Sequence, residues 1–419
     1  MNLLKLFLIN DGVKKDKLII ILKNIIMFGF CFWVFAVPVN KLSSKIFFYL
    51  GISLWLFITI LVRKVKFYKD FIPKTILNKL LLIFLVSGVL SVIFSIDFGL
   101  SQRIFFERYI VYCLFFWFSY AIIADSKRNL NLIVILLTTL GILFGLGALR
   151  DYFIFKPERL SSFFGIKPNF AVYLALLIPF NFVIIFSNVN KILKYLSLAS
   201  FSLMIFLFVA HGSRGVWLGV LISIAVVVFI RKKYLILIII LIIFSSCFYS
   251  KILPNEIKGR VESLTNIYNN AAVNERLYFS VLAFNIFKEH PIFGAGLGAF
   301  GKLNSKIEKP IHIHTHNMFA EVMAEMGIVG LLAFLSIVFT FLVRFIKNLY
   351  IWGKTRGCEK ITATAAGAAI FACFILNLSY SSILVGFQDA LMFWLILAIA
   401  VNDKVFDMEL GSSREGALK

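Results

Sequence analysis

The chain has 419 residues, of which 61% are hydrophobic and only 15% are charged, and its formal net charge is +22 at pH 7. Soluble globular domains usually carry about a quarter charged residues, so this composition, with a mean hydropathy of +0.93, excludes a water-soluble fold. A nucleic-acid partner would need the positive charges on one continuous surface, whereas Lys and Arg here recur in every second connection between apolar runs. Nucleic-acid binding is therefore not expected.

The apolar runs are long enough to cross a bilayer. About 20 residues of helix span the hydrocarbon core, and a backbone in lipid must satisfy its own hydrogen bonds, which favours helices. The sequence thus predicts an all-α polytopic membrane protein. Twelve spans are predicted, at 18–38, 46–62, 80–96, 104–124, 130–149, 168–187, 193–210, 215–230, 234–250, 317–343, 361–383 and 387–402.

The charges between these runs predict the orientation of the chain. Lys and Arg concentrate in connections that an even number of spans would leave in the cytoplasm together with both termini. No cleavable signal peptide is expected at the N-terminus, and the five cysteines, in spans or on the cytoplasmic side, suggest no disulfide framework. The predicted parts are 1–250 (nine spans), 251–316 (a periplasmic loop), 317–402 (three spans) and 403–419 (a cytoplasmic tail).

The predicted external loop, 251–316, is much longer than an ordinary connection, and loops of this length are usually functional or disordered. Its apolar residues recur at near-helical spacing, which predicts one or two amphipathic helices over the membrane face. Residues 296–301 match the dinucleotide motif G-x-G-x-x-G but lack the βαβ context it needs. These glycines more plausibly let the backbone pass close to a neighbouring helix or a ligand. The spaced residues are Val273, Leu277, Val281, Phe284 and Phe287.

Three external arginines have distinctive settings, each beside Gly, Ser or the start of a helix: Arg159, Arg214 and Arg276. A guanidinium group suits a phosphate because its planar fork makes paired charge-assisted hydrogen bonds and keeps its charge. A single arginine at a helix end more often extends to lipid headgroups. Three together favour an anionic site, and the chain has no D-x-D pair for a metal that would escort a sugar nucleotide.

Three histidines alternate just before the tenth predicted span, at His312, His314 and His316. An extended backbone would put all three imidazoles on one side, with Asn317 capping the helix that follows. Neutral imidazole can act as a general base, and we assign that role to His316. Alternating histidines can also bind zinc, but a further ligand at matching spacing is not evident, since Glu321 lies a turn further on. His312 and His314 fit equally well as hydrogen-bonded interface residues, and no metal or cofactor is expected.

These motifs together resemble the O-antigen ligase family. The resemblance is carried by "RLSSFFGIKPNFAVYLALLIPF" (159–180), "HGSRGVWLG" (211–219), "HPIFGAGLGAF" (290–300) and "HTHNMFAEVMAEMGIVGLLAF" (314–334). It covers roughly residues 150–345 by motif and the whole chain in length and number of spans. The histidine–asparagine motif in its glycine-flanked setting is fairly specific, whereas the arginine motifs alone are weak.

The resemblance implies a GT-C-type membrane glycosyltransferase of the bacterial inner membrane, with a periplasmic active site. It would move a glycan from undecaprenyl pyrophosphate to a lipid A-core acceptor, among membrane lipids. By motif, Arg159, Arg214 and Arg276 would bind the donor pyrophosphate and His316 would activate the acceptor hydroxyl. Asp389 loosely matches an acidic position of the family, and a helix N-terminal charge favoured by the dipole explains it equally well. His314, Asn317 and Glu321 are possible supporting residues.

Three other functions remain open at this stage. A polymerase of the same superfamily would add the glycan to another carrier-linked glycan, and a protein O-oligosaccharyltransferase would add it to serine or threonine. A transporter of lipid-linked glycan is a different class, and would be expected to bury charges near the bilayer midplane. Here the ionisable residues gather near the predicted outer edge, which favours the enzyme.

Overall fold

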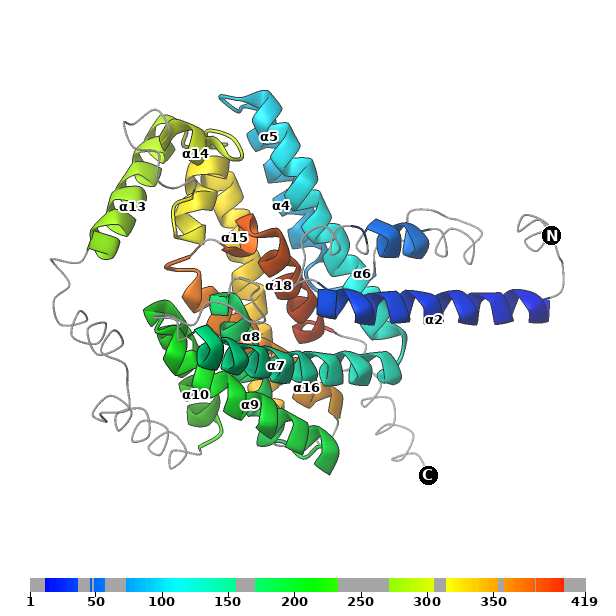
Figure 1. Ribbon diagram of the computed structural model, residues 1–419. Coiled ribbons are helices and arrows are strands. Elements are labelled where there is room, and N and C mark those ends of the chain that lie inside the picture. The colour runs from blue at the N-terminus through cyan, green and yellow to red at the C-terminus, as the bar shows by residue number, and fades with distance from the viewer. Residues whose placement is uncertain are drawn as a thin grey trace, which may run out of the picture.

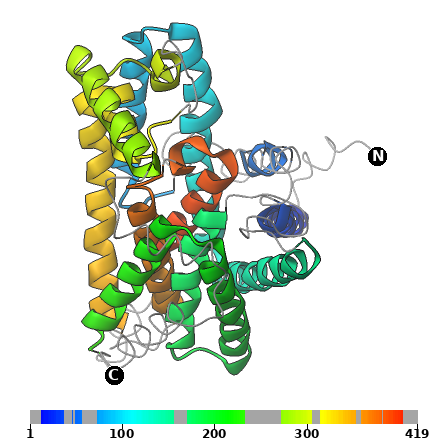
Figure 2. The ribbon, with the colours of Figure 1, turned by 60° about the vertical axis from the view of Figure 1, so that its left-hand side comes forward.

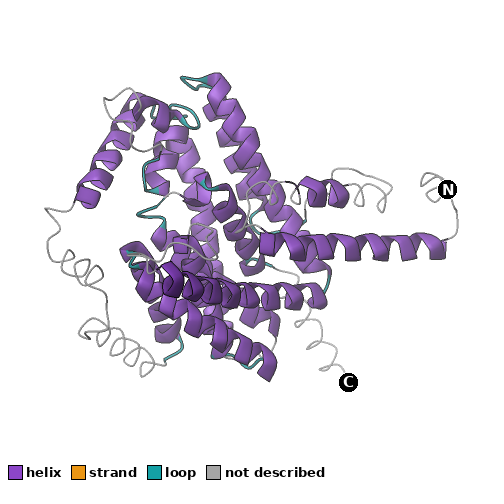
Figure 3. Ribbon diagram, in the orientation of Figure 1, coloured by secondary structure: helices purple, strands orange, loops and turns teal. Residues whose placement is uncertain are grey.

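The computed structural model is helical throughout the residues that it describes (Figures 1 and 3). No strand occurs among these residues, so the predicted all-α fold class is confirmed for them. The described residues are 12–36, 46, 49–56, 73–155, 170–232, 271–304, 314–352, 358–380 and 382–402.

The helices follow the apolar runs of the sequence, and α5, η1 and α6 form one continuous helical segment. Their bounds are α2 (Gly12–Ala36), α4 (Asn78–Ile93), α5 (Phe98–Ile104), the π-helix η1 (Phe105–Ile110), α6 (Val111–Asp125), α7 (Lys127–Phe155), α8 (Phe170–Ile185), α9 (Lys191–His211), α10 (Arg214–Ile230), α13 (Ala271–Glu289), α14 (Ala299–Asn304), α15 (Met318–Trp352), α16 (Cys358–Leu376), α17 (Ser382–Val385) and α18 (Phe387–Ala400).

Four helical segments are long and apolar enough to cross a membrane: Phe98–Asp125, Lys127–Phe155, Lys191–His211 and Met318–Trp352. Six shorter apolar helices of 10–17 residues also lie at predicted spans. The membrane-protein class is therefore supported. The predicted span 234–250 and part of 46–62 lie outside the described residues, so the number of twelve spans stays a prediction.

One group of helices packs around α8, which is buried on all sides from Phe170 to Ile184. It contacts α9, α10 and α16, as expected for a helix that is apolar all round. Small residues allow α16 to come close to its neighbours, because a Cβ atom on Gly219 of α10 would lie 2.6 Å from the carbonyl oxygen of Ala372. Close approach at small residues is a common way for helices to associate in membranes.

A second group contains α4, α5, η1, α6 and α15, and α18 links the two groups by contacting both α6 and α16. Figure 1 shows α5, α13 and α14 at the same end of the molecule, toward the top of the view. Figure 2 shows the same helices after a turn of 60°. Helices α13 and α14 contact α15, so the segment that was predicted to be a long loop is partly helical.

Helix α15 is broken near its N-terminal end, at Gly327, where φ is 63° and ψ is −162°. The backbone N–H groups of Ile328 and Val329 donate to the carbonyl oxygens of Pro291 (2.9 Å) and Ile292 (3.3 Å). A break within an apolar segment is costly unless its polar groups find partners. Here residues 290–298, which we call the glycine loop, supply those partners.

The glycine loop also donates hydrogen bonds to α15 and approaches it closely. The N–H groups of Ala295 and Gly296 donate to the carbonyl oxygens of Ala324 (3.0 Å) and Glu325 (3.1 Å). Gly294 has φ 77°, and a Cβ atom there would overlap the backbone of Glu325. The expectation that the glycines of residues 296–301 let the backbone pass close to a neighbouring helix is confirmed at Gly298, where a Cβ atom would overlap Cδ1 of Ile104 on α5.

The amphipathic helix predicted in the external loop is present as α13, but its buried side differs from the spaced apolar residues seen in the sequence. Leu277, Val281 and Phe284 are exposed. The buried side consists of Phe279, Ala283 and Ile286, which form a cluster with residues of α14 and α15. Leu277, Val281 and Phe284 thus lie on the outer face of α13, because the helix packs against α14 and α15 through Phe279, Ala283 and Ile286.

Candidate active site

The polar residues that precede α15 form a short turn, residues 314–317, which we call the histidine turn. Asn317 ends it as a helix cap: its Oδ1 atom accepts hydrogen bonds from the N–H groups of Phe319 (3.0 Å) and Ala320 (3.3 Å). The predicted capping role of Asn317 is therefore confirmed. Capping satisfies N–H groups that have no partner within the helix, and fixes where α15 begins.

Glu321, one turn into α15, contacts two residues of the histidine turn. Its Oε1 atom lies 3.2 Å from Nδ1 of His314, and its Oε2 atom lies 3.2 Å from Oγ1 of Thr315. Thr315 Oγ1 also donates to the carbonyl oxygen of Asn317 at 2.6 Å and accepts from the N–H of the same residue at 3.1 Å. One buried carboxylate therefore holds the residues on the N-terminal side of His316.

His316 adopts a left-handed backbone conformation, with φ 56°. The extended backbone that would put all three imidazoles on one side is thus not present at this position, because the chain turns sharply to enter α15. A non-glycine residue in this region costs about 1 kcal/mol or more, and such residues cluster at functional sites. The imidazole of His316 is a neighbour of two aromatic rings, Phe279 of α13 and Tyr380, whose ring centroids are 6.1 Å and 6.2 Å away.

Arg214 is the first residue of α10, next to the turn that follows α16. A Cβ atom on its neighbour Gly215 would lie 2.7 Å from Oγ of Ser379 in that turn. In the same turn, the carbonyl oxygen of Asn377 accepts from the N–H of Met318 at 3.1 Å. The turn therefore joins the start of α10 to the start of α15. A cation is unfavourable at a helix N-terminus, so an anion beside Arg214 would relieve a local electrostatic cost.

Arg276 lies on α13, three residues before Phe279, the ring that packs against His316. Residues three apart lie on neighbouring positions of a helix surface. Arg276 is exposed, and its carbonyl oxygen accepts from Oγ of Ser280 at 2.8 Å. The helix that carries Arg276 thus contacts the histidine turn through the ring of Phe279.

Other predicted site residues are not brought to the histidine turn by the described contacts. Arg159 and His312 lie outside the described residues. Asp389 is buried in the first turn of α18, within electrostatic range of Tyr112 of α6 and Tyr173 of α8. Asp389 therefore lies where α18 packs against its neighbours. An acidic residue in the first turn of a helix is favoured by the helix dipole, and this position agrees with that explanation.

The sequence reasoning missed a second buried carboxylate, Glu325, one turn after Glu321. It is 5% exposed and lies within electrostatic range of Glu321 and of Arg108 on η1. The backbone N–H groups of Gly298 and Phe300 are directed at its carboxylate. The i, i+4 spacing of two acids in an apolar run was the signal that could have found it. The π-helical turn that carries Arg108 was not predictable, although such turns are frequent at functional sites.

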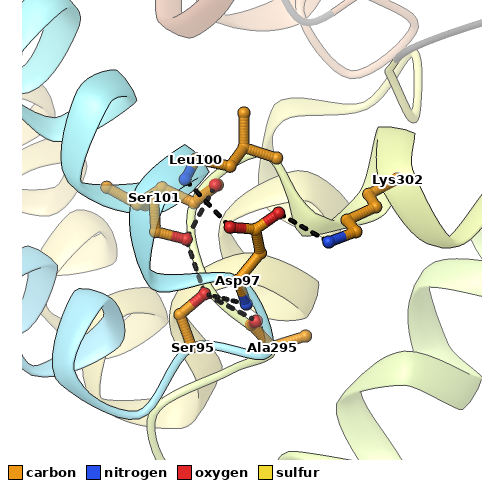
Figure 4. A network of polar contacts seen from close by, with 7 residues as sticks. Ser95, Asp97, Leu100, Ser101, Ala295 and Lys302 are labelled. Atoms are coloured by element: carbon orange, nitrogen blue, oxygen red, sulfur yellow. Dashed lines mark hydrogen bonds and ion pairs between the residues drawn. The ribbon is translucent and has the colours of Figure 1, made fainter.

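A polar network fixes the glycine loop to the turn between α4 and α5 (Figure 4). The N–H of Ile96 donates to the carbonyl oxygen of Ala295 at 3.0 Å, and Ser101 Oγ donates to that of Leu297 at 3.0 Å. Beside them, Lys302 donates to Asp97 at 2.5 Å. This hydrogen bond, together with that from the Leu100 N–H, lowers the pKa of Asp97 below its ordinary value.

The histidine turn carries two imidazoles, and the two helices near it carry Arg214 and Arg276. Among the described residues, no three His, Cys, Asp or Glu side chains are grouped as a metal site would need. The arginines are suited to a phosphate-type anion, and an imidazole is suited to taking a proton from a hydroxyl.

Helical architecture and a polar turn at the start of a membrane helix define the class, an all-α membrane protein with a candidate active site at one end. Comparison with protein families then gives the particular assignment: residues 199–335 match the family model described as O-antigen ligase. This match confirms the resemblance carried by the motifs and assigns this segment to the O-antigen ligase family. The segment contains Arg214, Arg276 and the histidine turn. The comparison with curated proteins found no match. Enzymes of the family are glycosyltransferase-like and act on lipid-linked glycans.

Proposed function

We propose that the chain is a metal-independent glycosyltransferase that moves a whole glycan from undecaprenyl pyrophosphate to a sugar hydroxyl of a lipid A-core acceptor. The observation that carries the proposal is the setting of His316. Its imidazole packs against Phe279 of the helix that bears Arg276 and against Tyr380 of the turn that abuts the start of α10, where Arg214 lies.

On the donor side, Arg214 and Arg276 bind the pyrophosphate, joined by Arg159 from the segment before α8. Negative charge develops on the leaving pyrophosphate as the glycosidic bond breaks. Guanidinium groups that are already in place stabilise this charge without a metal ion. The first turn of α10 adds the positive end of its helix dipole to Arg214.

On the acceptor side, His316 contacts and activates the hydroxyl, which is a poor nucleophile while it keeps its proton. The hydroxyl attacks the anomeric carbon opposite the departing phosphate, so the reaction inverts that centre. The strained backbone of His316 and the two flanking rings hold the imidazole in one position, which reduces the entropy cost of reaching the transition state.

Both substrates are lipids, so the site opens toward the outer leaflet of the bacterial inner membrane, and both termini lie in the cytoplasm. The exposed residues Leu277, Val281 and Phe284 of α13 suit contact with this membrane surface. In this arrangement α13 serves as a lid over the two substrates, in the manner of the GT-C enzymes that the family resembles.

The test is glycan transfer by the purified protein in detergent, with undecaprenyl-pyrophosphate-linked glycan as donor and lipid A-core as acceptor. We expect the wild-type protein to form product and His316→Ala, purified in equal amount, to form none. Product formed without a sealed compartment is incompatible with pure transport. Transfer only to carrier-linked glycan, or only to a protein, would replace the proposed acceptor, and full activity of His316→Ala would remove the role of His316.

A further inference from the structure

The histidine turn contains an imidazole tied to a buried carboxylate, and this imidazole is not the one assigned above. Nδ1 of His314 lies 3.2 Å from Oε1 of Glu321. The side chain of Glu321 is 5% exposed, whereas that of His314 is 30% exposed. The carboxylate is thus enclosed, and part of the imidazole reaches the outside of the turn.

This geometry determines which nitrogen of His314 can take a proton. A carboxylate accepts hydrogen bonds, so Nδ1 must carry a hydrogen to bond it, and the lone pair then lies on Nε2. An imidazole whose second nitrogen is held by an acid, and which is itself near a nucleophile, is the arrangement in which general bases are commonly found. The other carboxylate oxygen of Glu321, Oε2, lies 3.2 Å from Oγ1 of Thr315, so the carboxylate is placed inside the turn.

We propose that His314 is a second catalytic imidazole of the site and that Glu321 is its positioning residue. This inference rests on the glycosyl transfer proposed above and changes one part of it. The general-base role predicted for His316 passes to His314, and His316 activates the hydroxyl by orienting it. Nε2 of His314 takes the proton of the acceptor hydroxyl while His316 directs the hydroxyl oxygen at the donor. The O–H bond breaks and an N–H bond forms. The oxygen bonds to the anomeric carbon, and the electron pair of the broken glycosidic bond leaves on the pyrophosphate.

The surroundings of Glu321 suit this role. When His314 takes up a proton, the carboxylate of Glu321 lies against the new positive charge and stabilises it. Ionisable groups of the described residues that interact with Glu321 include Glu325 on the same helix and Tyr109 on η1. Arg108, also on η1, acts on Glu325 and Tyr109. The pair is therefore part of a buried charge cluster rather than an isolated surface contact.

The first test compares Glu321→Gln with wild type in the detergent assay. Glutamine keeps the shape of the side chain and can still bond Thr315 and His314, but its amide can donate to Nδ1 and so leave the hydrogen on Nε2. We expect kcat to fall by about 100- to 10,000-fold, as is typical when a general base is lost, with little change in the KM for donor. Glu289→Gln, an exposed acid at the end of α13, is the matched control and should keep wild-type kcat.

The second test asks whether the two residues act as one unit. His314→Gln should lose as much activity as Glu321→Gln, and the double variant should be no worse than either, because groups that act together are non-additive. If the fold-loss of kcat in the double variant equals the product of the two single losses, the residues act separately. That result would contradict the proposal that His314 and Glu321 work as one unit.

A third measurement does not depend on activity. The chain has only five histidines, so ¹⁵N-labelled histidine can be followed in the detergent-solubilised protein, with the His314 signals identified by their loss in His314→Gln. We expect hydrogen on Nδ1 of His314 in the wild type and on Nε2 in Glu321→Gln. An unchanged tautomer, or a Glu321→Gln variant with wild-type kcat, would reduce Glu321 to a structural contact. A wild-type protein without transfer activity would instead contradict the proposed function, whatever the tautomer.

Discussion

The glycine loop and the histidine turn both meet the N-terminal part of α15, but they are held by different kinds of contact. The glycine loop is joined to α15 mainly through backbone groups, as in the hydrogen bonds from Ile328 to Pro291 and from Ala295 to Ala324. The histidine turn is held by side chains, chiefly Asn317, Thr315 and Glu321. Where the two backbones approach most closely, as at Gly294, only glycine fits, whereas side-chain contacts place specific functional groups.

This difference separates stability from chemistry within one short stretch of the molecule. The glycine loop completes the broken helix α15, so changes there should act on folding. The histidine turn presents imidazoles beside the arginine-bearing helices, so changes there should act on transfer while the protein stays folded. The predictions below test this division, from the largest expected effect to the smallest.

Gly294→Ala should have the largest effect, on stability. The residue has φ 77°, and an added Cβ atom would overlap the backbone of Glu325. A left-handed alanine and an overpacked contact each cost roughly 1–3 kcal/mol, so the folded yield in detergent should fall sharply. Gly29→Ala is the matched control: nothing lies within 4 Å of a Cβ atom at that helical glycine, and thermal unfolding should be unchanged or slightly improved. A stable Gly294→Ala protein would show that the glycine loop is not required to complete α15.

Arg276→Lys should come next, with an effect on transfer rather than on folding. Lysine keeps the charge but cannot make the paired contact to a phosphate. We expect kcat/KM to fall by about 10- to 100-fold, close to the loss for Arg276→Ala, with unchanged thermal unfolding. Arg103→Lys, at an exposed arginine of α5, serves as control and should stay fully active. Full activity of Arg276→Lys would make Arg276 a membrane anchor.

Asn317→Ala should have a moderate effect on stability and an additional one on transfer. Loss of a helix cap costs about 1 kcal/mol, which thermal unfolding in detergent would detect. The matched control is Asn190→Ala, since Asn190 caps α9 in the same way, accepting from the Leu193 N–H at 2.7 Å. Both variants should lose similar stability, but only Asn317→Ala should also lose transfer. Equal activities would mean that the cap does not help to position the histidine turn.

Asp97→Asn should have the smallest effect, and one that depends on pH. Because its pKa is lowered in the folded protein, Asp97 contributes stability above its unfolded pKa of about 3.9, and this contribution is lost as pH falls through the folded pKa. Wild type should therefore unfold at a slightly higher temperature than Asp97→Asn at neutral pH. The difference should begin to shrink below about pH 3.9 and disappear only below the lowered folded pKa. The ion pair with Lys302 is exposed, so added salt should shrink the difference. A difference that persists in acid would have another cause.

Several features were predictable because they depend on local sequence. The apolar runs gave helices at ten of the predicted spans, since a backbone in lipid has few other ways to pair its polar groups. Asn317 was identified as a cap because such residues satisfy N–H groups of the first turn. The close approach of the glycine loop to a helix was also foreseen, although not which helix it would approach.

Other features could not be predicted because they depend on contacts between distant segments. The apolar spacing in residues 273–287 indicated a helix correctly, but only packing against α14 and α15 decided that Phe279 and Ala283 are buried. The left-handed turn at His316 was not foreseen, and it arises from the entry into α15. The role of Glu325 likewise depends on N–H groups supplied by residues 298 and 300.

The sequence by itself determined the membrane class, the helical elements and the residue types suited to glycan transfer, because hydropathy, capping and side-chain chemistry act locally. The tertiary structure decided which of these residues meet. It brought Phe279 of α13 and Tyr380 of the turn after α16 next to His316, and it paired His314 with a carboxylate one turn into α15. Contacts between residues of different helices depend on how whole helices pack, and packing is decided by all the surfaces that the chain buries together.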